Sequence, residues 1–225
     1  MKHLNRRQWL RTAGLTSAIL ATGRLGNAAP IQNPSFEPTA SVNGIVRLAA
    51  NENPYGPSPK IIAAMKEVMS ASFRYPNMYY QPLIEKIAQK EGVSPAHVLL
   101  TSGSNEGLRV AGLTYSLHGG EILTSMPTYD ALMSYAKEMG AYINAAPLDA
   151  NMGFDLEEIE KRVNTNTRLV FLCNPNNPSG TLLDANLTKD FCETVSERTM
   201  LFSDEAYYDY IDTPNYPSMV YLVKQ

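Results

Sequence analysis

Two short phrases near the end of the chain carry the side chains best suited to chemistry. They read Cys173-Asn-Pro-Asn-Asn-Pro-Ser-Gly180 and Ser203-Asp-Glu-Ala-Tyr207. Each follows an apolar run, residues 168–172 and 199–202, that is typical of a buried strand. Because ligands bind at the carboxyl ends of parallel strands, we expect an amide, a carboxylate and a phenol to meet there. Such a set suits a protonated pyridine ring that carries a neighbouring phenolate oxygen.

Four further segments belong to the same pattern: Asn51-Glu-Asn-Pro-Tyr-Gly-Pro-Ser-Pro59, Arg74-Tyr-Pro76, Gly103-Ser-Asn-Glu106 and Pro127-Thr-Tyr129. With these segments in the family's order, the chain from about Arg47 to its end resembles the class I/II, fold-type-I aminotransferases that use pyridoxal phosphate, and most of all their histidinol-phosphate aminotransferase-like branch. Neither G-x-G-x-x-G nor G-K-[ST] occurs, which argues against nicotinamide and nucleoside-triphosphate sites.

The apolar periodicity predicts strands that alternate with helices over most of the chain. This order is typical of an α/β fold, a mostly parallel sheet with helices on both faces, which the resemblance identifies as the large domain of a fold-type-I pyridoxal-phosphate transferase. The expected strands are residues 97–101, 121–125, 142–146, 168–172 and 199–203, and the expected helices are residues 83–91, 105–117, 130–139, 155–163 and 185–196.

The chain is expected to divide into three parts. Residues 1–28 form a signal peptide, and residues 29–75 form an N-terminal arm with a small-domain helix that begins at Ser58-Pro59. Residues 76–225 form the cofactor-binding large domain. Because the sequence stops after Val220-Tyr-Leu-Val-Lys-Gln225 without a closing signal, we expect this domain to be truncated at its C-terminus.

The resemblance assigns the central chemical role to Asp204. A buried carboxylate beside a pyridine nitrogen stabilises the protonated ring, which then withdraws electrons from the substrate Cα. An aspartate that caps a turn after a strand is the alternative interpretation.

Asn177 and Tyr207 are expected to hydrogen-bond the phenolate oxygen of the ring. The resemblance selects Asn177, which directly precedes Pro-Ser-Gly, over Asn174 and Asn176. It also selects Tyr207 by its spacing of three from Asp204, although Tyr208 and Tyr210 lie close by. A plain turn also fits the composition of the asparagine-proline phrase, and a turn is compatible with a site.

Gly103, Ser104 and Asn105 lie between an expected strand and an expected helix. Backbone N–H groups and the positive end of a helix favour a phosphate at such a turn, and Ser104 adds a hydroxyl group. The resemblance assigns Tyr129 to stacking on the cofactor ring. The alternative is that Tyr129 fills the start of a helix.

Two further residues are assigned by resemblance alone. Tyr75 matches the residue that reaches the cofactor phosphate of a neighbouring subunit, which implies a homodimer with a shared active site. Asn51 is expected near the substrate. The two substrates implied are a small-molecule amino donor and a 2-oxo acid.

The family's Schiff-base lysine, which follows a serine well downstream of the aspartate, does not fall within these 225 residues. Lys224 is the only lysine after Asp204, but it lacks the preceding serine. We therefore expect aminotransferase activity from a longer protein. The alternatives are another fold-type-I enzyme, such as a decarboxylase or lyase, and an inactive module that only binds the cofactor.

The N-terminus differs in charge from the remainder of the chain. Residues 1–28 hold five basic and no acidic residues, which leaves 14 basic and 22 acidic residues in the rest, a formal net charge of −8. Asn5-Arg-Arg-Gln-Trp-Leu-Arg11 resembles a twin-arginine export motif, and cleavage is expected near Ala28. We expect handling by the twin-arginine machinery, a periplasmic location, and no stable membrane insertion. An acidic mature chain is a poor partner for nucleic acid.

The two cysteines, Cys173 and Cys192, both stand at apolar positions of expected elements. Buried free thiols are common at such positions, so we expect two unreactive thiols. His3, His97 and His118 are too scattered to suggest a metal site.

Overall fold

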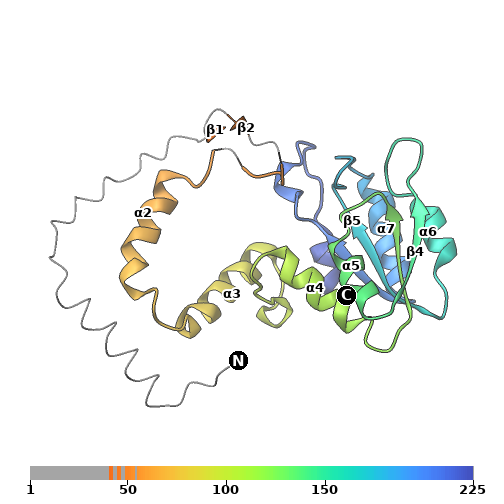
Figure 1. The fold of residues 1–225 in the computed structure, drawn as a ribbon, viewed down its shortest axis with the longest axis horizontal. Coiled ribbons are helices and arrows are strands. Elements are labelled where there is room, and N and C mark those ends of the chain that lie inside the picture. Colours follow the sequence, from red (N-terminus) through yellow and green to blue (C-terminus); the bar gives the residue numbers. More distant parts are fainter. Residues whose placement is uncertain (1–40, 43–44, 47–48, 54, 225) are drawn as a thin grey trace, which may run out of the picture. The chain divides into compact units, whose positions relative to one another are not determined.

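The computed structural model describes residues 41–42, 45–46, 49–53 and 55–224, drawn in colour in Figure 1. The chain divides into two compact units, Met1–Arg74 and Tyr75–Gln225. The expected signal peptide and the first part of the expected arm, residues 1–40, lie outside the described residues. In the described part, none of the helices combines the length and the apolar character needed to cross a membrane.

The first unit contains few described elements. Strands β1 (Ser41–Val42) and β2 (Ile45–Val46) form a short antiparallel pair. Helix α2 (Pro59–Val68) begins where expected, because the Ser58 hydroxyl oxygen accepts a hydrogen bond from the Ile61 N–H. The 3₁₀ helix η1 (Met69–Ala71) follows directly. None of the α2 residues is buried within the chain, so its apolar face is exposed.

The second unit opens with helix α3 (Asn77–Glu91), which begins six residues before the expected position. Gly92 ends α3 in a left-handed conformation, with a φ of 66°. The 3₁₀ helix η2 (Pro95–His97) comes next, and the expected strand at residues 97–101 is wrong. A strand needs a backbone partner, and no described segment pairs with these residues. Leu99 is accordingly 80% exposed.

The other four expected strands are confirmed. They are β3 (Glu121–Met126), β4 (Tyr142–Pro147), β5 (Thr167–Cys173) and β6 (Met200–Asp204). They form one parallel sheet in the order β4-β3-β5-β6. Strand β4, the next along the chain after β3, pairs with one edge of β3, whereas β5 pairs with the other edge. The strand order therefore reverses between β3 and β5. In open α/β sheets such a reversal marks the crevice where ligands bind.

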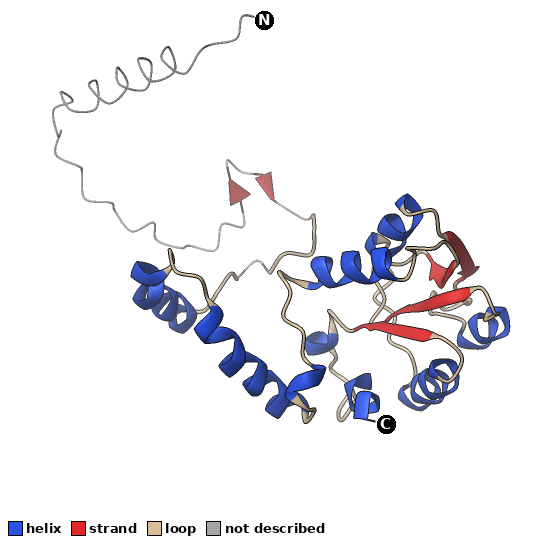
Figure 2. Ribbon diagram, turned by 90° about the horizontal axis from the view of Figure 1, so that it is seen from below, coloured by secondary structure: helices blue, strands red, loops and turns tan. Residues whose placement is uncertain are grey.

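Helices cover both faces of this sheet, as expected (Figure 2). Helices α4 (Ser104–Thr114) and α5 (Ala131–Glu138) pack against each other, and so do α6 (Leu156–Arg162) and α7 (Ala185–Ser196) on the opposite face. The 3₁₀ helices η3 (Tyr208–Tyr210) and η4 (Met219–Lys224) complete the unit. Because β5 is covered on both faces, Leu169 through Leu172 are wholly buried and form the centre of the core.

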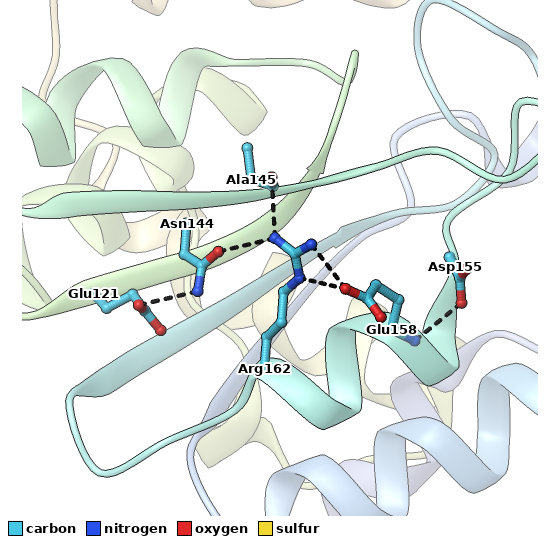
Figure 3. A network of polar contacts seen from close by, with 6 residues as sticks. All are labelled: Glu121, Asn144, Ala145, Asp155, Glu158 and Arg162. Atoms are coloured by element: carbon cyan, nitrogen blue, oxygen red, sulfur yellow. Dashed lines mark hydrogen bonds and ion pairs between the residues drawn. The ribbon is translucent and has the colours of Figure 1, made fainter.

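A network of polar side chains lies at the amino end of the sheet (Figure 3). The buried Glu121 carboxylate accepts hydrogen bonds from Asn144, Asn164 and Thr167. The Arg162 guanidinium donates a hydrogen bond to the Asn144 side-chain oxygen. This contact orients the Asn144 amide nitrogen toward Glu121. Arg162 also forms an ion pair with Glu158 at 2.7 Å. This network stabilises the end of the sheet that lies away from the candidate site.

Candidate functional site

The loops that follow β5 and β6 bring together two of the expected site residues. The side-chain amide of Asn177 donates a hydrogen bond to the Tyr207 hydroxyl oxygen at 3.4 Å, and both side chains are partly buried. The pairing of Cys173 with Asp204 at the ends of the two strands sets both loops side by side. An amide donor and a phenol therefore converge at the carboxyl edge of the sheet.

Asp204 is the last residue of β6 and is only 6% exposed. One carboxylate oxygen accepts a hydrogen bond from the Ala206 N–H at 3.1 Å. Burial raises the pKa of the Asp204 carboxyl above its ordinary value, and this hydrogen bond opposes that rise only in part. No lysine, arginine or histidine among the described residues forms an ion pair with it. A cation placed next to Asp204 would therefore be held by a poorly solvated negative charge.

The turn before α4 carries the expected phosphate-binding residues. Gly103 caps the helix with a φ of 79°, a conformation that favours glycine, and an added Cβ would meet nothing within 4 Å. Ser104 and Asn105 form the first turn of the helix, where N–H groups lack intrahelical partners. Tyr129, in the loop after β3, donates its hydroxyl hydrogen to the Asn105 side-chain oxygen at 2.9 Å. The structure thus brings the expected stacking residue to the expected phosphate turn.

A groove of about 660 Å³ connects this turn with the end of β6. Ser104 and Asp204 both line it, together with apolar side chains of α4 and β6. A concave, mostly apolar surface with a few polar groups has the character of a small-molecule site, although Asn177, Tyr207 and Tyr129 do not line this groove.

Tyr75 and Asn51 are the two remaining expected site residues. Tyr75, the first residue of the second unit, is 89% exposed. Asn51 belongs to the first unit, where it adopts a left-handed backbone conformation with a φ of 51°. Their expected roles stay predictions.

Sequence reasoning missed the residues that support the two loops. The Asn174 amide donates to the Tyr216 hydroxyl at 2.7 Å, and that hydroxyl donates to the main-chain oxygen of Leu183 at 3.0 Å. Glu205 accepts hydrogen bonds from the Ser218 hydroxyl and the Met219 N–H. No local pattern signals these contacts, since Tyr216 and Ser218 come from a separate segment that only the tertiary fold brings near.

Both cysteines are free and buried, as expected. Burial raises the pKa of the Cys173 thiol to about 11 and that of the Cys192 thiol to about 12. Cys173 ends β5 beneath the site and donates to the Pro175 main-chain oxygen at 3.4 Å. Within the described ranges, no group of His, Cys, Asp or Glu side chains is arranged to hold a metal ion.

Comparison with known proteins gives one consistent family. The sequence model of the family described as "Aminotransferase class I and II" matches residues 43–224. The histidinol-phosphate aminotransferase of Anaeromyxobacter sp. is 38% identical over 176 residues, which cover 78% of this chain and 48% of that protein. The histidinol-phosphate aminotransferase of Moorella thermoacetica is 36% identical over 209 residues, which cover 92% of this chain and 53% of that protein. The chain spans about half the length of the curated relatives it matches.

Solved structures give the same result for the fold. The histidinol-phosphate aminotransferase from Sinorhizobium meliloti, solved in complex with pyridoxal-5'-phosphate, is 27% identical with a TM-score of 0.66. The similarity covers 70% of this chain and 43% of that one. The histidinol-phosphate aminotransferase from Clostridium acetobutylicum is 26% identical with a TM-score of 0.66, over 78% of this chain and 51% of that one.

Proposed function

The chain belongs to the class I and II aminotransferases, and from this premise we propose that its second unit binds pyridoxal 5'-phosphate as part of an aminotransferase. One observation carries the proposal: the buried Asp204 carboxylate lies at the end of the strand next to the loop whose Asn177 amide contacts Tyr207. A protonated ring nitrogen and a neighbouring phenolate oxygen need these two kinds of partner.

The residues present fit this cofactor in charge and in position. Asp204 has a raised pKa because of burial, and a positively charged ring nitrogen beside it would stabilise its ionised form. Asn177 and Tyr207 offer hydrogen-bond donors to the phenolate oxygen. Gly103, Ser104 and Asn105 offer backbone N–H groups and a hydroxyl to the phosphate, and Tyr129 offers an aromatic face near that turn.

When bound, pyridoxal phosphate supplies the carbonyl carbon that takes up the amino group and the ring that draws electrons from the substrate Cα. The chain's own residues hold and tune that ring. Asp204 keeps the proton on the ring nitrogen, which maintains the electron-withdrawing form. Asn177 and Tyr207 orient the ring and stabilise negative charge on its oxygen.

The proposed reaction transfers an amino group between an amino acid or amine and a 2-oxo acid. The relatives are named for histidinol phosphate, which makes an imidazole-bearing amino phosphate the first donor to test. In those relatives the matched region is about half of the protein. We therefore assign the activity to a longer protein whose second half supplies the covalent lysine and the remaining substrate contacts.

Two further parts of the proposal rest on sequence. The exposed Tyr75 would reach the phosphate of a second copy in a homodimer, and Asn51 would contact the substrate.

The twin-arginine phrase Asn5–Arg11 supports export to the periplasm. Replacing Arg6 and Arg7 together with lysine should keep the protein in the cytoplasmic fraction, and unchanged export would contradict the assignment.

Titration of the chain with pyridoxamine 5'-phosphate tests the cofactor proposal. This probe has no aldehyde, so it does not react with surface lysines. We expect saturable one-to-one binding, measured by calorimetry, and a loss of about tenfold in affinity for Asp204→Asn, equal to about 1.4 kcal/mol. Asp190→Asn, an exposed carboxylate on α7, is the matched control and should leave the affinity unchanged. A folded wild-type chain without saturable binding would falsify the proposal.

A further inference from the structure

Asn176 is a buried asparagine whose side-chain and main-chain hydrogen-bonding groups are all used. It is 3% exposed. Its side-chain oxygen accepts from the Thr128 hydroxyl at 2.8 Å, and its amide donates to the Pro127 main-chain oxygen at 3.2 Å and to the Ser179 hydroxyl at 2.9 Å. Its own N–H donates to the Thr181 oxygen, and its main-chain oxygen accepts from the Gly180 N–H. A fully satisfied buried amide of this kind fixes the segments that it joins.

The segments that Asn176 joins are far apart in sequence. Thr128 lies in the loop after β3, and Asn176 lies 48 residues later in the loop after β5. These two strands are neighbours, and the strand order reverses between them. The contact therefore crosses the crevice where a ligand would bind.

Each partner directly precedes a residue of the proposed site. Tyr129 follows Thr128 and carries the aromatic ring assigned to the cofactor. Asn177 follows Asn176 and carries the amide assigned to the phenolate oxygen. Because each partner is the sequence neighbour of one of these residues, the hydrogen bond between Thr128 and Asn176 constrains the distance between that ring and that amide.

We propose that Asn176 and Thr128 act as a positioning pair that holds Tyr129 and Asn177 in register around the cofactor ring. This inference rests on the proposed function, since it concerns how the same site is held. Neither residue is assigned a contact with the ring. Their contribution is preorganisation, in which the two loops are ordered before the ligand arrives.

The test compares two buried threonines at opposite ends of the same sheet. Thr128→Val keeps the shape of the side chain but leaves the Asn176 oxygen without its donor. Thr128→Ser keeps the hydroxyl and should restore the wild-type behaviour. Thr167→Val is the matched control, because the buried Thr167 hydroxyl donates to Glu121 at 2.8 Å in the network at the amino end.

Two measurements on the 225-residue chain separate positioning from general stability. The first is the dissociation constant for pyridoxamine 5'-phosphate, which should rise about tenfold in Thr128→Val, equal to about 1.4 kcal/mol, and stay unchanged in Thr167→Val. The second is amide hydrogen exchange in peptides that span residues 126–130 and 174–181. Both peptides should lose protection together in Thr128→Val and keep it in Thr167→Val.

The outcomes distinguish this inference from the proposed function. If Thr128→Val and Thr167→Val bind the probe equally well, or if the two loops keep their protection in Thr128→Val, the positioning pair is rejected. If the wild-type chain binds no probe, the proposed function fails, and hydrogen exchange then decides alone whether the pair couples the two loops.

Discussion

The side-chain amide of Asn177 lies 3.4 Å from the hydroxyl of Tyr207, although thirty residues separate them in the chain. The contact exists because β5 and β6 pair in parallel, with Cys173 opposite Asp204 at their carboxyl ends. Each side chain stands three or four residues beyond its strand, so the same register that joins the strands also joins the site. The Asn177–Tyr207 contact is therefore a consequence of the sheet.

Removal of the Tyr207 hydroxyl should weaken cofactor binding. We expect Tyr207→Phe to lower the affinity for pyridoxamine 5'-phosphate by about fivefold to tenfold, because one hydrogen bond contributes roughly 1 kcal/mol. Asn177→Ala should give a similar loss, and the double variant should lose less than the sum, since the two side chains contact each other. Tyr210→Phe serves as the control, because the Tyr210 side chain is 73% exposed. Strict additivity would contradict a shared binding role.

Replacement of Asp204 should stabilise the unliganded chain while it weakens binding. Burial raises the pKa of this carboxyl, so the folded chain holds the proton to a higher pH than the unfolded chain does. As the pH rises above the ordinary value near 4, the ionised carboxylate lowers the stability of the folded state. Asp204→Asn should raise the Tm at pH 7, and the gain should disappear below about pH 4. A lower Tm for the variant at pH 7 would count against a costly buried charge.

The two thiols should be unreactive in the folded chain. The pKa of Cys173 is raised to about 11 and that of Cys192 to about 12 because both are buried, so neither is ionised at pH 8. We expect no reaction with Ellman's reagent at pH 8 without denaturant and two reactive thiols per chain in guanidinium chloride. Rapid labelling of either thiol in the folded chain would show that the end of β5, for Cys173, or helix α7, for Cys192, opens to solvent.

The network at the amino end of the sheet should depend on the Glu121 charge. Its three partners, Asn144, Asn164 and Thr167, all donate to the carboxylate. Glu121→Gln places an amide N–H group against these donors and should lower the free energy of unfolding by about 1–3 kcal/mol. Urea titration measures this change. Glu157→Gln, on the exposed side of α6, is the control and should change stability by less than about 0.5 kcal/mol.

Helix α4 contains two glycines that should respond in opposite ways to alanine. A Cβ on Gly112 would lie 2.6 Å from the Leu132 main-chain oxygen, because α4 and α5 approach closely there. At Gly107 the nearest atom would be 4.0 Å away. We expect Gly112→Ala to destabilise the chain by about 1–3 kcal/mol and Gly107→Ala to stabilise it by up to about 1 kcal/mol. Similar changes in stability for both variants would show that helix propensity, and not the close contact at Gly112, determines the effect of alanine.

Local sequence determined most of the helices and strands of the second unit. The apolar runs of β3 and β5, the Asp184 cap of α7 and the left-handed Gly92 are decided by neighbouring residues, so each was predictable. The same holds for the position of Asp204 at the end of β6 and of Asn177 in the loop after β5. The phrases themselves carry the resemblance to the aminotransferases.

Contacts between residues far apart in the sequence determined the remaining features of the fold and the site. Residues 97–101 have the composition of a strand, yet they form none because no described segment offers them a backbone partner. The partners of Asn176 and Asn174, namely Thr128 and Tyr216, lie more than forty residues away. Such contacts depend on strand order and register, which no local pattern contains. The sequence thus determined the chemical groups of the site, and the tertiary structure decided which of them meet.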